Sequence, residues 1–158
     1  MLTVGEYLND DFRGMTADMI FNAENLINRV NLLESHYYQE NPEAPRLTLA
    51  SGRRLPETNA RTPGASPTSW HLKCAAIDRG EARSVRPFAR WCVANLHLLA
   101  DPLINLYMED PRTTIGQWTS WVHLQIFPPK SGVRVFIPTA DWAARLKGDP
   151  LSPGDIKA

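Results

Sequence analysis

Two histidines and one aspartate in this chain have the residue types and the order of a catalytic zinc site. Asp78 follows His71 closely, and His123 lies in the later strand-like run 121–126. Zinc binds neutral histidine nitrogens and carboxylate oxygens, and a site with three protein ligands leaves its fourth position open to water. A structural zinc more often fills that position with cysteine. The three residues therefore indicate hydrolysis rather than a purely structural metal.

Hydrophobic periodicity predicts the helices that must support this site. Apolar residues recur at three- and four-residue steps from Thr16 to about Gln39, which is typical of a long amphipathic helix with Thr16 as its N-cap. The same periodicity predicts a second helix over residues 87–99, and we expect one short helix in the tail from Asp141. These segments form the helical part of the fold.

Alternation of polar and apolar residues predicts the strands. They cover residues 46–52, 103–108, 122–127 and 133–137, and the last two are expected to pair through the Pro/Gly turn at 128–132. Residues 53–68, with three prolines and a glycine, are predicted to be a loop that runs into His71. The predicted fold class is α+β: a small, mainly antiparallel sheet that carries the zinc site, with helices packed on one side.

Composition limits the partners. The 158 residues suggest one domain, and 17 basic side chains balance 17 acidic ones, so neither nucleic acid nor an anionic membrane is indicated. No apolar run is long enough for membrane insertion, and residues 1–30 lack the pattern of a signal peptide. Cys74 and Cys92 are expected to be free, buried thiols. The oligomeric state is left open.

The chain resembles the zinc D-Ala-D-Ala carboxypeptidases and dipeptidases, whose relatives include phage L-alanyl-D-glutamate endopeptidases. That family combines a Ser-Gly-x-Arg strand end, a loop asparagine, a Ser-x-His-x6-Asp motif and a Trp-x-His strand. All four occur here in order, as Ser51-Gly52-Arg53-Arg54, Asn59, Ser69-Trp70-His71 with Asp78, and Trp121-Val122-His123. The resemblance covers residues 16–138 and implies a hedgehog/D-Ala-D-Ala metallopeptidase fold.

The resemblance also implies an activity and a set of roles. His71, Asp78 and His123 would hold Zn²⁺, and the substrate would be an amide bond in a peptidoglycan stem peptide. Arg54 would polarise the substrate carbonyl or bind a substrate carboxylate. Ser69 would contact the substrate backbone or orient a ligand. Gln125 should face the same side as His123, where it would bind substrate or tune the site.

The main departure from the family pattern concerns the general base. Ser120 stands three residues before the second histidine, where the best-known members carry a catalytic Glu or Asp. A peptidase of this type needs a carboxylate there or elsewhere to move protons. Glu109, at the end of a predicted strand, is the candidate, and Asp110 is the second choice. A solvated acid at a strand end is the structural alternative for both.

Smaller departures are Lys73, in place of a usual glycine, and Gln125, in place of Asp or Ser. Trp118 and Trp121 either wall the cleft or belong to the core. Three hypotheses remain open: an active phage or prophage lysin, an inactive zinc-binding member used as a phage structural or binding module, and a metal-free structural domain. The lysin is expected to be made in the cytoplasm and to reach the cell wall by holin release or virion delivery.

Overall fold

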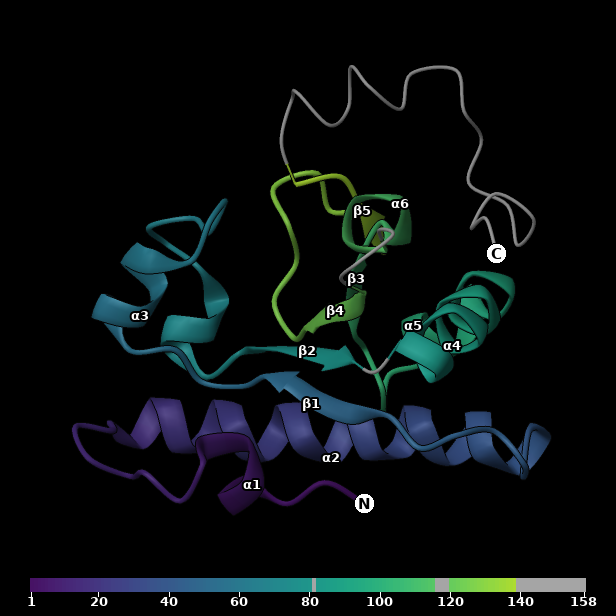
Figure 1. Cartoon of the computed structure of the whole chain (residues 1–158), viewed down its shortest axis with the longest axis horizontal. Coiled ribbons are helices and arrows are strands. Elements are labelled where there is room, and N and C mark those ends of the chain that lie inside the picture. Colours follow the sequence, from purple (N-terminus) through teal and green to yellow (C-terminus); the bar gives the residue numbers. More distant parts are fainter. Residues whose placement is uncertain (81, 116–119, 139–158) are drawn as a thin grey trace.

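The computed structural model describes residues 1–80, 82–115 and 120–138, and it contains a sheet with helices around it (Figure 1). The helices are α1 (Val4–Leu8), α2 (Ala17–Glu40), α3 (Pro56–Arg61), the 3-10 helix η1 (Trp70–Lys73), α4 (Ala82–Ala94), α5 (Leu96–Ala100) and α6 (Pro111–Thr114). The strands are β1 (Thr48–Ser51), β2 (Ala76–Gly80), β3 (Tyr107–Glu109), β4 (Trp121–Gln125) and β5 (Val135–Phe136). The α+β prediction is confirmed.

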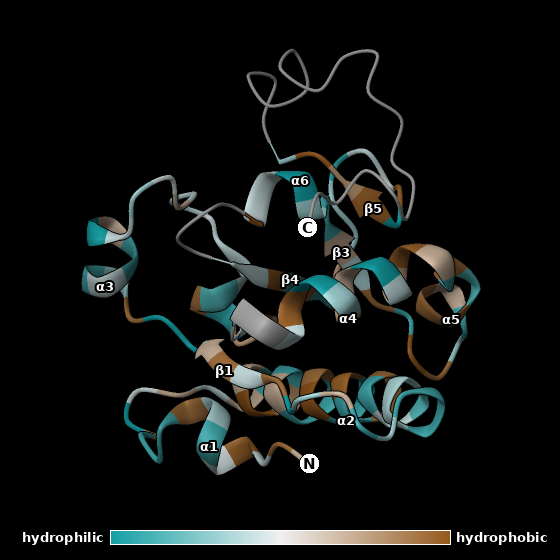
Figure 2. Cartoon of the chain, turned by 45° about the vertical axis from the view of Figure 1, so that its right-hand side comes forward, coloured by the Kyte–Doolittle hydropathy of each residue, from teal (hydrophilic) through white to brown (hydrophobic). Residues whose placement is uncertain are grey.

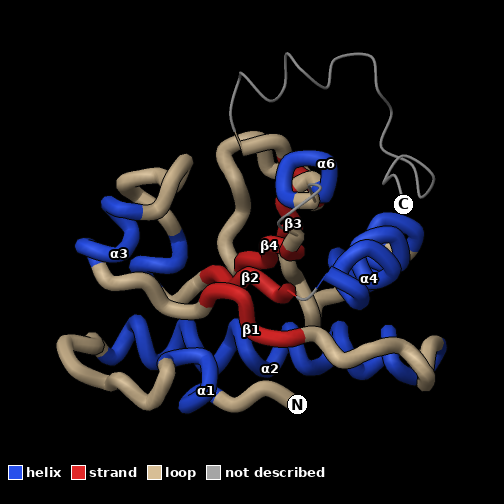
Figure 3. The backbone as a smooth tube through the Cα atoms, in the orientation of Figure 1, coloured by secondary structure: helices blue, strands red, loops and turns tan. Residues whose placement is uncertain are grey.

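Helix α2 is the longest element and runs along one side of the sheet (Figures 1 and 3). Its predicted N-cap is confirmed, because the Thr16 hydroxyl accepts a hydrogen bond from the Met19 amide at 3.2 Å. Hydrophobic and hydrophilic residues are interspersed along it (Figure 2), as expected for an amphipathic helix. Within the described ranges, no helix is both long enough and apolar enough to cross a membrane.

The sheet has the strand order β1-β2-β4-β3-β5, and its neighbours are antiparallel except for the parallel pair β3 and β5. The predicted pairing of the last two strands is therefore wrong. Strand β4 has β2 on one edge and β3 on the other, so it offers no edge to β5. The chain after β4 passes beyond β3 and adds β5 to the remaining free edge.

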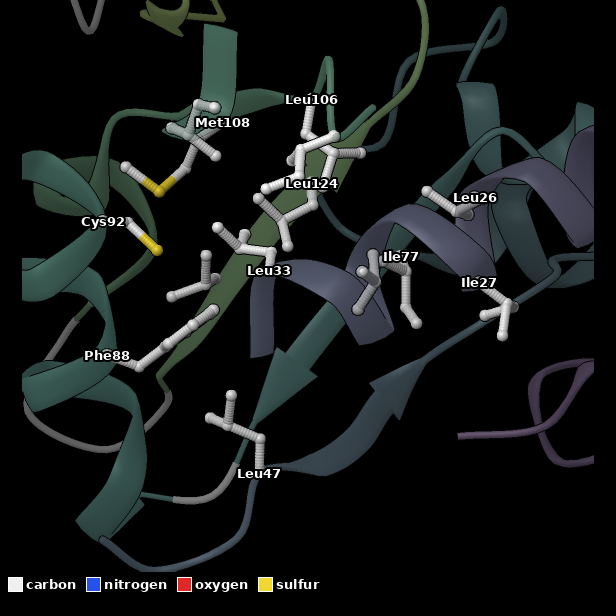
Figure 4. Close-up of a cluster of buried hydrophobic side chains, with 14 of the residues drawn as sticks. Leu26, Ile27, Leu33, Leu47, Ile77, Phe88, Cys92, Leu106, Met108 and Leu124 are labelled. Carbon is white, nitrogen blue, oxygen red and sulfur yellow. The ribbon is translucent and has the colours of Figure 1, made fainter. Parts of the chain in front are cut away.

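The core lies between the sheet and helices α2 and α4 (Figure 4). Alternate strand residues, among them Ile77, Leu124 and Met108, face this core. Its helical side consists of buried residues from α2 and α4, among them Leu26, Leu33, Phe88 and Cys92. Both cysteines are free and buried, as predicted. A buried ion pair, 2.6 Å between Arg79 Nε and Glu34 Oε1, joins β2 to α2 beside this core.

Several predicted boundaries differ from the structure. The 53–68 loop contains α3, with Pro56 at its first position, where a missing amide costs no helical hydrogen bond. Helix α4 starts at Ala82, so Pro87 lies inside it instead of opening it. The strand predicted at 103–108 is limited to Tyr107–Glu109. Strand β2 was not predicted, and the short helix expected in the tail falls outside the described residues.

Candidate metal centre

A row of polar side chains crosses the sheet on the face turned away from α2. The register pairs Asp78 of β2 with His123 of β4, and Ser51 of β1 with Asp78. Extension of the β3–β4 register puts Glu109 beside His123 in the same row. Facing residues on neighbouring strands have Cβ atoms about 4.5–5.5 Å apart. Two predicted ligands and the predicted base are thus brought together by strand pairing.

The third predicted ligand, His71, comes from η1 and is almost fully buried. Ser69 caps this short helix, with its hydroxyl accepting a hydrogen bond from the His71 amide at 3.4 Å. The imidazole Nδ1 lies 2.7 Å from the carbonyl oxygen of Gly52. Gly52 must be glycine, because a Cβ there would collide with the Tyr7 carbonyl oxygen. Gly52, directly after β1, therefore holds the His71 ring in place through its carbonyl oxygen.

Three donor atoms converge at this point. His123 Nδ1 lies 2.8 Å from Asp78 Oδ1, His71 Nε2 lies 3.3 Å from the same oxygen, and the two histidine nitrogens are 3.4 Å apart. The opposite ring nitrogens face carbonyl oxygens, Gly52 O for His71 and Gln125 Oε1 for His123 at 3.2 Å. Each ring can donate its proton outward and direct a lone pair inward. The buried group His71, Asp78 and His123 can hold a metal ion.

The charges around the three donors suit a cation. Burial would raise the pKa of Asp78, but hydrogen bonds from His123 and His71 outweigh burial and hold this pKa well below its usual range. Burial lowers the pKa of His71, which favours the neutral imidazole that a metal requires. Burial opposes a proton on His123, yet its bond to Asp78 raises the pKa of His123 overall. A metal ion would replace that proton.

Arg54 lies at the edge of the centre and is partly exposed. Its Nη2 donates to Asp78 Oδ2 at 2.7 Å, and its Nε donates to Ser51 Oγ at 3.0 Å. Asp78 thus presents one oxygen to the histidines and the other to the guanidinium. Arg54 Nη1 has no hydrogen-bond acceptor within the described part of the chain. That group remains available to a ligand.

The two acids considered as bases have different surroundings. Burial raises the pKa of Glu109, and the positive charge of His123 opposes this effect. The Glu109 carboxylate lies 2.7 Å from the Thr113 hydroxyl. Asp110, in contrast, caps α6 through the Arg112 amide and forms a 2.8 Å ion pair with the Arg112 guanidinium. Of the two, Glu109 has the carboxylate placed beside the ligand row.

Other predicted site residues lie near the centre in supporting positions. Gln125 accepts at Oε1 from His123, and its Nε2 donates to the Phe127 carbonyl at 2.7 Å. Both ends of this amide are thus engaged within the protein. Trp121 is half-buried, and Trp118 lies outside the described residues. Lys73 is exposed, with its ammonium 5.1 Å from the ring centroid of Trp70.

Replacement of Gln125 by leucine is expected to weaken binding of Zn²⁺, used as the probe metal, by about 10- to 100-fold. The reason is that His123 Nε2 loses the acceptor that fixes its tautomer and ring orientation. Isothermal titration with Zn²⁺ measures the effect. Gln125→Glu keeps an acceptor, and its Zn²⁺ affinity should be within a few-fold of that of the parent protein. Gln39→Leu, at an exposed position of α2, is the matched control. Unchanged affinity in Gln125→Leu would contradict this role.

The fold and the centre define an α+β protein with a candidate metal site formed by a strand pair and a short helix. No protein-family model matches this chain, and no match was found among curated proteins or solved structures. The resemblance to zinc carboxypeptidases therefore stays a prediction from the motif residues of the sequence. Thr113 was not assigned from the sequence, because its contact with Glu109 joins strand β3 to helix α6 and has no helical spacing that would predict it.

Proposed function

We propose that this protein is a zinc-dependent peptidase that hydrolyses an amide bond in peptidoglycan stem peptides. The observation that carries the proposal is the convergence of His71, Asp78 and His123 beside a half-buried carboxylate, Glu109. Metal ligands alone would suit a binding protein as well. A carboxylate with a raised pKa next to them supplies the proton acceptor that hydrolysis needs.

The geometry of the donors supports zinc. In a tetrahedral site with zinc bonds of about 2.0–2.1 Å, neighbouring ligand atoms are about 3.3–3.4 Å apart. The His71 nitrogen has this separation from both the Asp78 oxygen and the His123 nitrogen. The shorter 2.8 Å contact between His123 and Asp78 is a hydrogen bond that a metal would replace. Two imidazoles and one carboxylate leave a fourth position for water or substrate.

Residues of the chain have separate tasks in this proposal. Zinc, when bound, supplies an electrophile that activates water and polarises a carbonyl. Glu109 accepts a proton from the attacking water and returns it to the leaving nitrogen of the amide. Arg54, through its unpaired Nη1, binds the carbonyl oxygen or a carboxylate of the substrate. Ser69 orients His71 through the cap of η1.

The substrate class rests on the order of the family motifs, which extends from Ser51 to His123. A phage or prophage lysin is the proposed context, with action at the cell wall. A second candidate, an inactive zinc-binding module of a phage particle, is favoured by Ser120 at the position where relatives carry the base. The position of Glu109 beside His123 supports the enzyme over this alternative.

The test combines metal analysis with hydrolysis. We expect about one zinc per chain by elemental analysis, and release of new amino groups from purified peptidoglycan that stops with a chelator and returns with Zn²⁺. Zinc without hydrolysis of peptidoglycan or of isolated stem peptides would favour the binding module. A protein that takes up no zinc would overturn both candidates.

A further inference from the structure

Thr113 makes two short contacts that a single hydroxyl proton cannot serve at once. Its Oγ lies 2.7 Å from Glu109 Oε1 and 2.7 Å from the backbone carbonyl oxygen of Asp110. The hydroxyl has one proton, and a carbonyl oxygen can only accept. The contact to Glu109 therefore takes its proton from either partner, depending on whether the carboxyl is ionised.

Both arrangements leave the heavy atoms in place. When Glu109 is ionised, the Thr113 hydroxyl donates to it and the carbonyl of Asp110 loses this donor. When Glu109 is protonated, its own O–H donates to Thr113 Oγ, and the threonine proton turns to Asp110 O. A rotation about one C–O bond exchanges the two states, because hydroxyl protons rotate to suit their partners. An ammonium group in this place could donate to the carboxyl but could not accept the proton of its O–H.

The geometry points to Thr113 as a positioning residue that holds the Glu109 carboxyl in one orientation both before and after it takes up a proton. This inference rests on the proposed function of Glu109 as base and then acid. It adds a requirement that metal binding does not impose, because Thr113 is not among the metal donors. Helix α6 supplies this hydroxyl directly after β3, and Asp110, as the N-cap of α6, fixes the turn between them.

The neighbouring residue offers a matched control. Thr114 is also a buried threonine of α6, and its hydroxyl has no hydrogen-bond partner among the described residues. Replacement of either threonine by valine removes a hydroxyl at nearly constant volume. Only the change at position 113 removes a contact to Glu109.

The experiment compares Thr113→Val, Thr113→Ser and Thr114→Val with the parent protein. For Thr113→Val we expect kcat on stem peptides to fall about 10- to 100-fold, with KM and zinc content unchanged. Thr113→Ser should restore kcat to within a few-fold of the parent, and Thr114→Val should match the parent. An unchanged kcat in Thr113→Val, or an equal loss in Thr114→Val, would overturn the inference.

A second measurement separates this inference from the proposed function. The carboxyl carbon of Glu109 is followed by nuclear magnetic resonance during a pH titration of the purified protein, whether or not it hydrolyses peptide. Because the hydrogen bond to the ionised carboxylate is stronger than the one from the neutral carboxyl, loss of the Thr113 hydroxyl should raise the pKa of Glu109 in Thr113→Val, with reversal in Thr113→Ser. An unchanged pKa would overturn the contact itself, and absent hydrolysis in the parent protein would reject only the peptidase.

Discussion

His71→Ala is expected to abolish stoichiometric zinc binding, with a loss of affinity of about a thousandfold or more. His71 supplies one of three converging donors, and its ring is fixed by a hydrogen bond to the Gly52 carbonyl oxygen. Alanine leaves two donors that no longer enclose the ion. Zinc titration measures the affinity directly. Thermal unfolding provides a second readout, because a ligand that binds only the folded state raises the unfolding midpoint, and a tighter ligand raises it further.

The histidine on the exposed face of α5 is the matched control. His97→Ala changes the same kind of side chain outside the donor group and should retain one zinc per chain. The parent protein and His97→Ala should unfold at higher temperature when zinc is added, whereas His71→Ala should not respond. Full zinc occupancy in His71→Ala would exclude this residue as a ligand and reject the proposed centre.

Glu109→Gln is expected to retain zinc and lose hydrolysis, with kcat lower by about a hundredfold to ten-thousandfold. Glutamine has the size of glutamate and can still accept a hydrogen bond from Thr113, but it cannot accept and return a proton. The zinc donors are untouched, so zinc content and the folded structure should be unchanged. Single-turnover kinetics on stem peptides at saturating substrate measures the chemical step.

Glu24→Gln, on the exposed face of α2, is the control for a change from carboxylate to amide. It should hydrolyse at the parent rate. Turnover by Glu109→Gln at the parent rate would move the general base to another residue. A joint loss of zinc and activity would instead assign Glu109 to the metal centre, and the division of roles between ligands and base would be wrong.

The sequence by itself determined the residues of the candidate centre and the longest helix. Periodicity predicted α2 almost to its ends, since a long helix with one apolar stripe and a threonine cap leaves a clear local pattern. The order of the serine, histidine and aspartate motifs selected His71, Asp78 and His123 before any contact was known. Helix periodicity and the order of motifs can both be read along the chain, so neither depends on how the strands pair.

The tertiary structure alone decided how those residues meet. Strand β2 was not predicted, because its fully buried residues show no polar alternation, yet its pairing with β4 is what puts Asp78 against His123. The pairing of β5 with β3 was likewise decided by which sheet edge was free. The contact between Thr113 and Glu109 depends on the turn from β3 into α6. Register and edge availability arise from long-range contacts, and residue spacing along the chain does not encode them locally.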